Sequence, residues 1–172
     1  MRIFHRSRRF SSALWVLLAA ALTVAPAAAQ DAVSGTFSFA GKTYKLTHVN
    51  VSRQPLMTDN SKIVFVVLLT DNPIPAKVLN DRFRLELTDL AREGKFHGVS
   101  VTIGADRKPV GTSWNYAKEF GGAMITRADQ HTFEAKALDD SHAEGQLFGQ
   151  GSIGDDKWDY SASCKTALTT SK

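Results

Sequence analysis

Cysteine is almost absent from this sequence, since Cys164 is the only one. A single cysteine excludes an internal disulfide, so in an oxidising compartment the fold must be stabilised by burial of apolar side chains. Apolar and polar residues alternate from Trp158 to Lys165. This period of two places Cys164, Trp158 and Tyr160 on the apolar face of one strand. We therefore expect a buried, unreactive thiol.

No apolar run after the first 24 residues approaches the length of a membrane span. The run at 13–24 (ALWVLLAAALTV) follows four arginines and precedes three alanines at 27–29, which is the pattern of a secretory signal peptide. Twelve residues are too few to cross a bilayer, which takes about 20. The sequence predicts a signal peptide at 1–29 and a single β-rich domain at 30–172, exported to a periplasm or out of the cell, with no transmembrane segment after cleavage.

A surplus of charge of one sign disappears with the signal peptide. The full chain has 21 Lys and Arg against 17 Asp and Glu, and the first nine residues contain four of the arginines. Without them the basic and acidic side chains balance. Because nucleic-acid-binding domains usually carry a basic surface, we expect no nucleic-acid partner.

Residues 148–156 read FGQGSIGDD, in which Gly149, Gly151 and Gly154 match the letters G-x-G-x-x-G of a dinucleotide-binding turn. That turn opens a helix whose N-terminal amides bind the pyrophosphate. Here two aspartates follow Gly154, and the remaining 18 residues are typical of a terminal strand. We interpret the glycines as a hairpin loop with positive φ, and we expect no nucleotide or other cofactor.

Catalytic and metal-binding spacings are also missing. The histidines after the signal peptide (48, 97, 131 and 142) never lie two to four residues from each other or from the cysteine, so no zinc-ligand spacing exists. Convergence in space stays open for His131 and His142, which begin two strands expected to pair. There is no G-x-S-x-G, S-x-x-K or H-E-x-x-H motif. We predict no catalytic residue and no metal ligand.

The sequence does contain short alternating stretches separated by turn signals. Eight of them are expected to be strands: residues 33–39, 43–52, 63–69, 97–103, 109–116, 132–138, 142–148 and 157–166. Residues 63–69 (IVFVVLL) are all apolar, which predicts a central strand covered on both faces. Residues 53–61 are expected to form a loop.

One short helix is expected near 82–93, with Asp81 as its N-cap and Gly94 beyond its C-terminus. The connections in the second half of the chain are short, which favours antiparallel neighbours. The predicted fold is therefore mainly β, an antiparallel sandwich or partly open barrel of about eight strands. The sequence leaves sandwich and barrel open.

Aromatic residues provide the one binding signal. Trp114, Asn115 and Tyr116 lie in an expected strand, and Trp114 shares a face with Tyr116. Pointing outward, this face would offer a stacking platform to a sugar ring or an apolar partner, whereas pointing inward it would be core. We take these three residues as candidate binding residues.

No motif of a named family stands out, and the sequence favours a non-enzymatic binding or interaction module. Its expected partner is a small molecule, a glycan or an envelope protein. One alternative is a cell-envelope hydrolase or lyase whose site is assembled from separated strands. Another is a structural or assembly component that acts through an edge strand.

Overall fold

The fold is mainly β. The computed structural model describes residues 31–79 and 84–168, and within them ten strands form two antiparallel sheets. Sheet A has the order β2-β1-β10-β9-β8, and sheet B has the order β3-β4-β5-β6-β7. The strands are β1 (Ala32–Phe39), β2 (Lys42–Leu46), β3 (His48–Leu56), β4 (Asp59–Thr70), β5 (Gly98–Ile103), β6 (Thr112–Ala117), β7 (Gly122–Arg127), β8 (His131–Leu138), β9 (His142–Ile153) and β10 (Asp156–Ala167).

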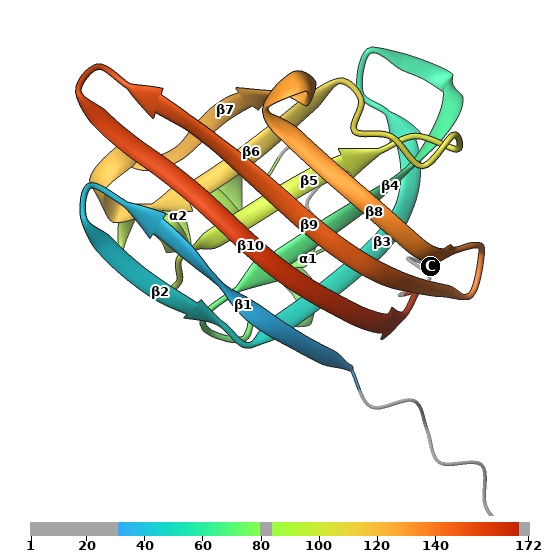
Figure 1. Cartoon of the computed structure of the whole chain (residues 1–172), viewed down its shortest axis with the longest axis horizontal. Coiled ribbons are helices and arrows are strands. Elements are labelled where there is room, and N and C mark those ends of the chain that lie inside the picture. The colour runs from blue at the N-terminus through green and yellow to red at the C-terminus, as the bar shows by residue number, and fades with distance from the viewer. Residues whose placement is uncertain (1–30, 80–83, 169–172) are drawn as a thin grey trace, which may run out of the picture.

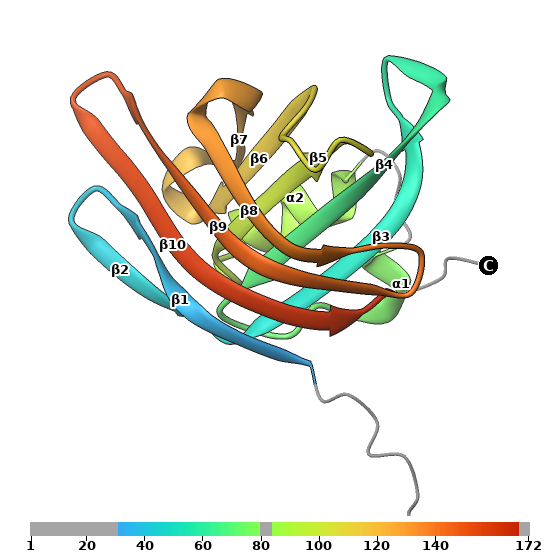
Figure 2. The same cartoon turned by 45° about the vertical axis from the view of Figure 1, so that its right-hand side comes forward.

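Three layers build the molecule. The two sheets face each other, and the helices α1 (Ala76–Leu79) and α2 (Leu85–Arg92) cover the outer face of sheet B (Figure 1). Figure 2 shows the same layers from the side and leaves the outer face of sheet A uncovered by any helix of the described chain. The arrangement is consistent with a sandwich, which is one of the two architectures expected from the sequence.

The chain runs as a meander that closes on itself. Successive strands are neighbours except at two points, where the chain passes between the sheets after β2 and after β7. The last strand, β10, pairs with the first, β1, so that Phe37 lies opposite Tyr160. Each sheet consequently ends in two edge strands, which are β2 and β8 in sheet A and β3 and β7 in sheet B.

The main core lies between the sheets and follows the alternation read from the sequence. Every second residue of β10 is buried, including Trp158, Tyr160 and Cys164. The prediction of a buried cysteine is confirmed. Burial raises the pKa of the Cys164 thiol to about 11, so the thiol is protonated and unreactive at neutral pH.

The apolar run at 63–69 forms the middle of β4, between β3 and β5. Phe65, Val67 and Leu69 point into the main core, while Leu68 packs under the helices in a second apolar cluster. The prediction of a strand covered on both faces is therefore confirmed.

The expected loop at 53–61 is wrong. Strands β3 and β4 continue through it and form a long hairpin that turns at Met57 and Thr58 (Figure 1). Side chains of this projecting tip are mostly exposed, and Asp59 accepts hydrogen bonds from the backbone and hydroxyl of Ser61. Because neither face of the tip is buried, the sequence there has no reason to alternate.

The expected helix exists but is shorter than 82–93. Helix α2 begins after Arg84, which adopts a left-handed conformation (φ 58°) and makes no side-chain cap. The proposed N-cap Asp81 lies outside the described residues. Gly94 does follow the helix with φ 69°, as the sequence indicated.

The glycine motif is not a loop for most of its length. Gly149 and Gly151 lie inside strand β9, and only Gly154, in the turn before β10, has a positive φ (56°). A Cβ at Gly149 would come 2.3 Å from the ring of Tyr160, and one at Gly151 would come 2.6 Å from the ring of Trp158. The two glycines therefore make room for aromatic rings that lie across the strand.

None of the helices in residues 31–79 and 84–168 is long and apolar enough to cross a membrane. The predicted signal peptide at 1–29 lies outside the described residues.

Candidate functional site

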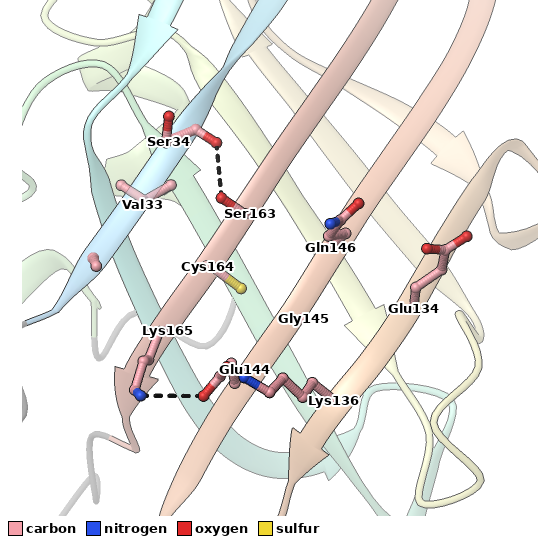
Figure 3. Close-up of a pocket in the computed structure, with 11 residues that line it drawn as sticks. Val33, Ser34, Glu134, Lys136, Glu144, Gly145, Gln146, Ser163, Cys164 and Lys165 are labelled. Carbon is pink, nitrogen blue, oxygen red and sulfur yellow. Dashed lines mark hydrogen bonds and ion pairs between the residues drawn. The ribbon is translucent and has the colours of Figure 1, made fainter.

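A hollow of about 480 Å³ lies on the uncovered outer face of sheet A. Figure 3 shows that its walls come from four neighbouring strands, β1, β10, β9 and β8. Its volume falls in the range of roughly 300–1,000 Å³ that is typical of small-molecule sites. We define this feature as the sheet A hollow.

Strand register assembles the hollow from two rows of side chains. The first row crosses the four strands as Ser34, Ser163, Gln146 and Glu134. The second row crosses them as Ala32, Lys165 and Glu144, with Lys136 beside the irregularity of β8. Residues two apart along a strand share a face, so polar positions from distant parts of the chain become neighbours.

Glu144 is the centre of the charged row. Its carboxylate accepts a hydrogen bond from Lys136 and lies 3.3 Å from Nζ of Lys165. The Glu144 side chain is only 18% exposed, while those of Lys136 and Lys165 are 77% and 53% exposed. The hydrogen bond from Lys136 lowers the pKa of Glu144 below its ordinary value, against a smaller opposing effect of burial. Figure 3 shows the two lysines approaching Glu144 from opposite sides.

The neutral row offers hydroxyl and amide groups. Ser163 donates from Oγ to the backbone oxygen of Ser34 over 3.4 Å, a long bond that a stronger acceptor would readily replace. Gln146 and Glu134 are exposed and continue this row on β9 and β8 (Figure 3). The hollow thus presents donors and acceptors together, with two lysines balanced by two glutamates.

A second cluster of titratable groups joins the two sheets at one end. The backbone N–H of His97 donates to the carboxylate of Asp71 over 2.7 Å, and Nδ1 of its ring is hydrogen-bonded to the same carboxylate at 2.8 Å. The ring of Tyr44 stacks on the imidazole with a centroid distance of 3.8 Å. Tyr44 also donates to Glu119, which is paired with Lys42 at 2.7 Å. These contacts link β2 of sheet A to the ends of β4 and β6, so they fasten the sandwich together.

Within this cluster, Glu119 and Tyr44 have shifted pKa values. The hydrogen bond from Lys42 lowers the pKa of Glu119, and the same contact raises the pKa of Lys42. Burial and the nearby Glu119 charge raise the pKa of Tyr44. Tyr44 is consequently a neutral donor at physiological pH.

A third polar group is buried inside the sandwich. The His131 ring bonds to Tyr160 Oη through Nδ1 (2.8 Å) and to Thr126 Oγ1 through Nε2 (2.7 Å). A neutral imidazole has one donor and one acceptor nitrogen, so one hydroxyl donates to the ring and the other accepts from it. Burial lowers the pKa of His131 to about 4, against a smaller effect of Asp129, and burial also raises the pKa of Tyr160.

The structure separates the three candidate binding residues. Trp114 is half-buried and Tyr116 fully buried on the outer face of sheet B, under α2, where Tyr116 packs 5.4 Å from Phe96. Asn115 points the opposite way, is fully buried, and its side-chain amide has no hydrogen-bond partner among the described residues. An exposed Trp114 and Tyr116 platform is not formed. Binding by these three residues stays a prediction, for which Trp114 alone retains exposed surface.

Convergence of His131 and His142, left open by the sequence, does not occur in the strand pairing. His131 lies opposite Gly149, whereas His142 lies opposite Ala167 at the other end of β9. Within residues 31–79 and 84–168 no three His, Cys, Asp or Glu side chains are grouped so as to hold a metal ion.

Sequence reasoning missed the residues of the sheet A hollow. Each of them occupies an ordinary polar position of an alternating strand, and no two strands of the hollow share a motif. Alternation of polar and apolar residues indicated that these side chains face outward. Only the register of β1, β10, β9 and β8 shows which of the outward polar side chains are neighbours.

Comparisons with protein-family models, with curated proteins and with solved structures find no match to this chain.

Proposed function

We propose that this chain is an exported, non-enzymatic binding module whose sheet A hollow takes a polar, hydroxyl-rich ligand such as an envelope glycan. The observation that carries the proposal is the hollow of about 480 Å³ on the outer face of a sheet that no helix of the described chain covers. Export is supported by the signal-peptide pattern of the first 29 residues.

The chemistry of the lining favours a glycan over an apolar or strongly charged ligand. Hydroxyl groups of Ser34 and Ser163 and the amide of Gln146 both donate and accept, as sugar hydroxyls do. The two lysines and two glutamates cancel in charge, so the hollow has no net attraction for ions of one sign. No aromatic ring is among the described residues that line it, so recognition would rest on hydrogen bonds instead of stacking.

The test is a calorimetric titration of the protein, purified from its exported compartment, with soluble glycan fragments released from the host envelope. Lys165→Ala and Gln146→Ala remove exposed groups of the hollow. Lys157→Ala and Gln150→Ala are matched controls, since they lie exposed on the same strands β10 and β9 outside the hollow. We expect each hollow variant to weaken binding by about tenfold, the equivalent of one charge-assisted or neutral hydrogen bond.

Equal affinities for all four variants would contradict the proposal, and so would the absence of heat with every fragment.

The hydrolase or lyase alternative is favoured by one observation, the Asp71 and His97 pair, because a carboxylate next to Nδ1 favours the tautomer of a neutral imidazole in which Nε2 is the acceptor. Cleavage of the added glycan by wild type but not by His97→Gln would support that alternative.

A further inference from the structure

Every open β-sheet must protect its edges, because an edge strand presents unpaired N–H and C=O groups that recruit other strands. Three of the four edges here carry such protection. Strand β2 is five residues long with lysines at both 42 and 45, β3 contains Pro55 at a register shift, and β8 has a second shift next to Lys136. Short length, proline, lysine and bulges are the usual means of preventing edge pairing.

Strand β7 is six residues long, one more than β2, and it has no lysine, no proline and no register shift. It reads GAMITR, is paired only with β6, shows no register shift, and carries its single charge on the last residue, Arg127. Ala123 to Thr126 are uncharged and contain no proline. The free edge of β7 is therefore the one edge in the described chain whose sequence does not oppose the addition of another strand.

The side chains beside this edge favour an apolar contact. Ile125 is 62% exposed and lies directly opposite the half-buried Trp114 of β6, so both occupy the outer face of sheet B. A single exposed isoleucine is ordinary on a protein surface. Here the exposed isoleucine lies on an unprotected edge beside a partly exposed tryptophan. A strand that paired with β7 would cover part of this apolar surface.

We propose that β7 pairs antiparallel with β7 of a second copy of this chain, about a two-fold axis at Ile125. This inference is independent of the sheet A hollow. An antiparallel edge is complementary to its own copy, because the two-fold axis matches N–H groups of one copy with C=O groups of the other. The N–H of Arg127 already donates to Gln130 Oε1, so the pairing would centre on residues 123–126. In this arrangement the two Ile125 side chains would lie side by side at the axis, on the outer face of the joined sheet. A Trp114 side chain would flank them on each side.

A second copy explains the distribution of edge protection better than an unrelated strand does. In the pair, two five-stranded B sheets become one continuous sheet in which both β7 edges are covered. The new sheet ends at β3 on both sides, and β3 is the edge with Pro55 and a register shift. The association is consequently closed at two copies and does not extend into a fibre.

Sedimentation velocity across a wide range of concentrations tests this proposal on the protein purified from its exported compartment. We expect a reversible monomer and dimer equilibrium in wild type. Ile125→Lys is expected to raise the dimer dissociation constant by about tenfold or more, because two lysines would meet at the axis. Ile153→Lys is the matched control, since Ile153 is also exposed (41%) but lies at the end of β9, and this variant should dimerise as wild type does.

If Ile125→Lys folds poorly, amide hydrogen exchange of the wild type provides a second test of the proposal. Amides in 123–126 should exchange more slowly at high than at low protein concentration, while those of the other edges should not change. A monomer at all concentrations overturns the proposal. The proposal is also overturned if Ile153→Lys weakens the dimer as much as Ile125→Lys does. A dimer in which the amide exchange rates of β7 do not depend on protein concentration overturns it as well.

Discussion

The buried His131 makes the stability of this protein depend on pH in a defined window. The imidazole is 6% exposed, and its burial lowers the pKa from 6.5 to about 4. The unfolded chain therefore binds a proton at a higher pH than the folded chain does. Stability is fully present above the unfolded pKa and falls as the pH drops from about 6.5 toward 4, where the folded ring is protonated as well.

The size of the effect follows from the shift. A change from 6.5 to about 4 corresponds to about 3 kcal/mol once the pH is below both values. Between about pH 7 and pH 5 the expected loss is about 2 kcal/mol, because protonation of the unfolded chain is then nearly complete. The pKa values of Glu119 and Glu144 are lowered from 4.5, so the stability that these carboxyl groups contribute is lost mainly below about pH 4.5, where they are protonated in the unfolded chain, and changes little between pH 7 and pH 5.

Urea unfolding followed by tryptophan fluorescence at about pH 7 and pH 5 measures this loss. His131→Gln keeps a donor and an acceptor but does not titrate, so the stability difference between the two pH values should shrink by about 2 kcal/mol, whatever the cost of the substitution itself. His48→Gln, at an exposed position, is the matched control and should keep the wild-type difference. An undiminished pH dependence in His131→Gln would refute the reasoning.

Three further outcomes follow from the packing. Gly149→Ala should destabilise the protein by about 1–3 kcal/mol in urea unfolding, because its Cβ would meet the Tyr160 ring at 2.3 Å; an unchanged midpoint would contradict this contact. Cys164 should react with a thiol reagent only after unfolding, and rapid labelling of the native protein would show that the thiol is accessible. Tyr116→Ala should cost about 3–5 kcal/mol and Trp114→Ala clearly less, since Trp114 is half-buried; the opposite order would reverse their assigned positions.

The sequence predicted best those elements that have one buried face. Strand β10 alternates along its whole length because its inner residues face the core and its outer residues face water, and both the strand and the burial of Cys164 are confirmed. The all-apolar stretch of β4 was equally informative, since helices cover one side and sheet A the other. Because a buried face requires apolar side chains, the spacing of apolar residues along a strand shows which of its faces are buried.

Parts of sheet B were missed. The β3 and β4 hairpin tip projects from the sandwich and buries little, so its residues resemble a loop in sequence (Figure 2). Strand β7 begins at Gly122 directly after Gly121, and two glycines in a row are more typical of a loop than of a strand. The strand count was about eight from sequence and is ten in the described chain, because β7 was missed and because the expected strand at 43–52 is two strands, β2 and the start of β3, which lie in different sheets.

The candidate site could not be predicted because it depends on register. Trp114 and Tyr116 were predicted to bind a ligand because they are aromatic. Helix α2 covers this part of sheet B, so Tyr116 is buried and Trp114 is half-buried. The sheet A hollow consists of serine, glutamine, lysine and glutamate at outward positions, which is also the composition of any solvated sheet face. Only the pairing of Lys165 with Glu144, and of Ser163 with Gln146, shows that these positions form one surface.

Mapping of ligand contacts by NMR tests the central claim most directly. Backbone amide shifts of the protein, recorded with and without glycan fragments from the host envelope, report which strands contact the ligand. We predict that the shifts gather on the outer face of β1, β8, β9 and β10 around Gln146 and Lys165. Shifts gathered around Trp114, or none at saturating glycan, would contradict the account.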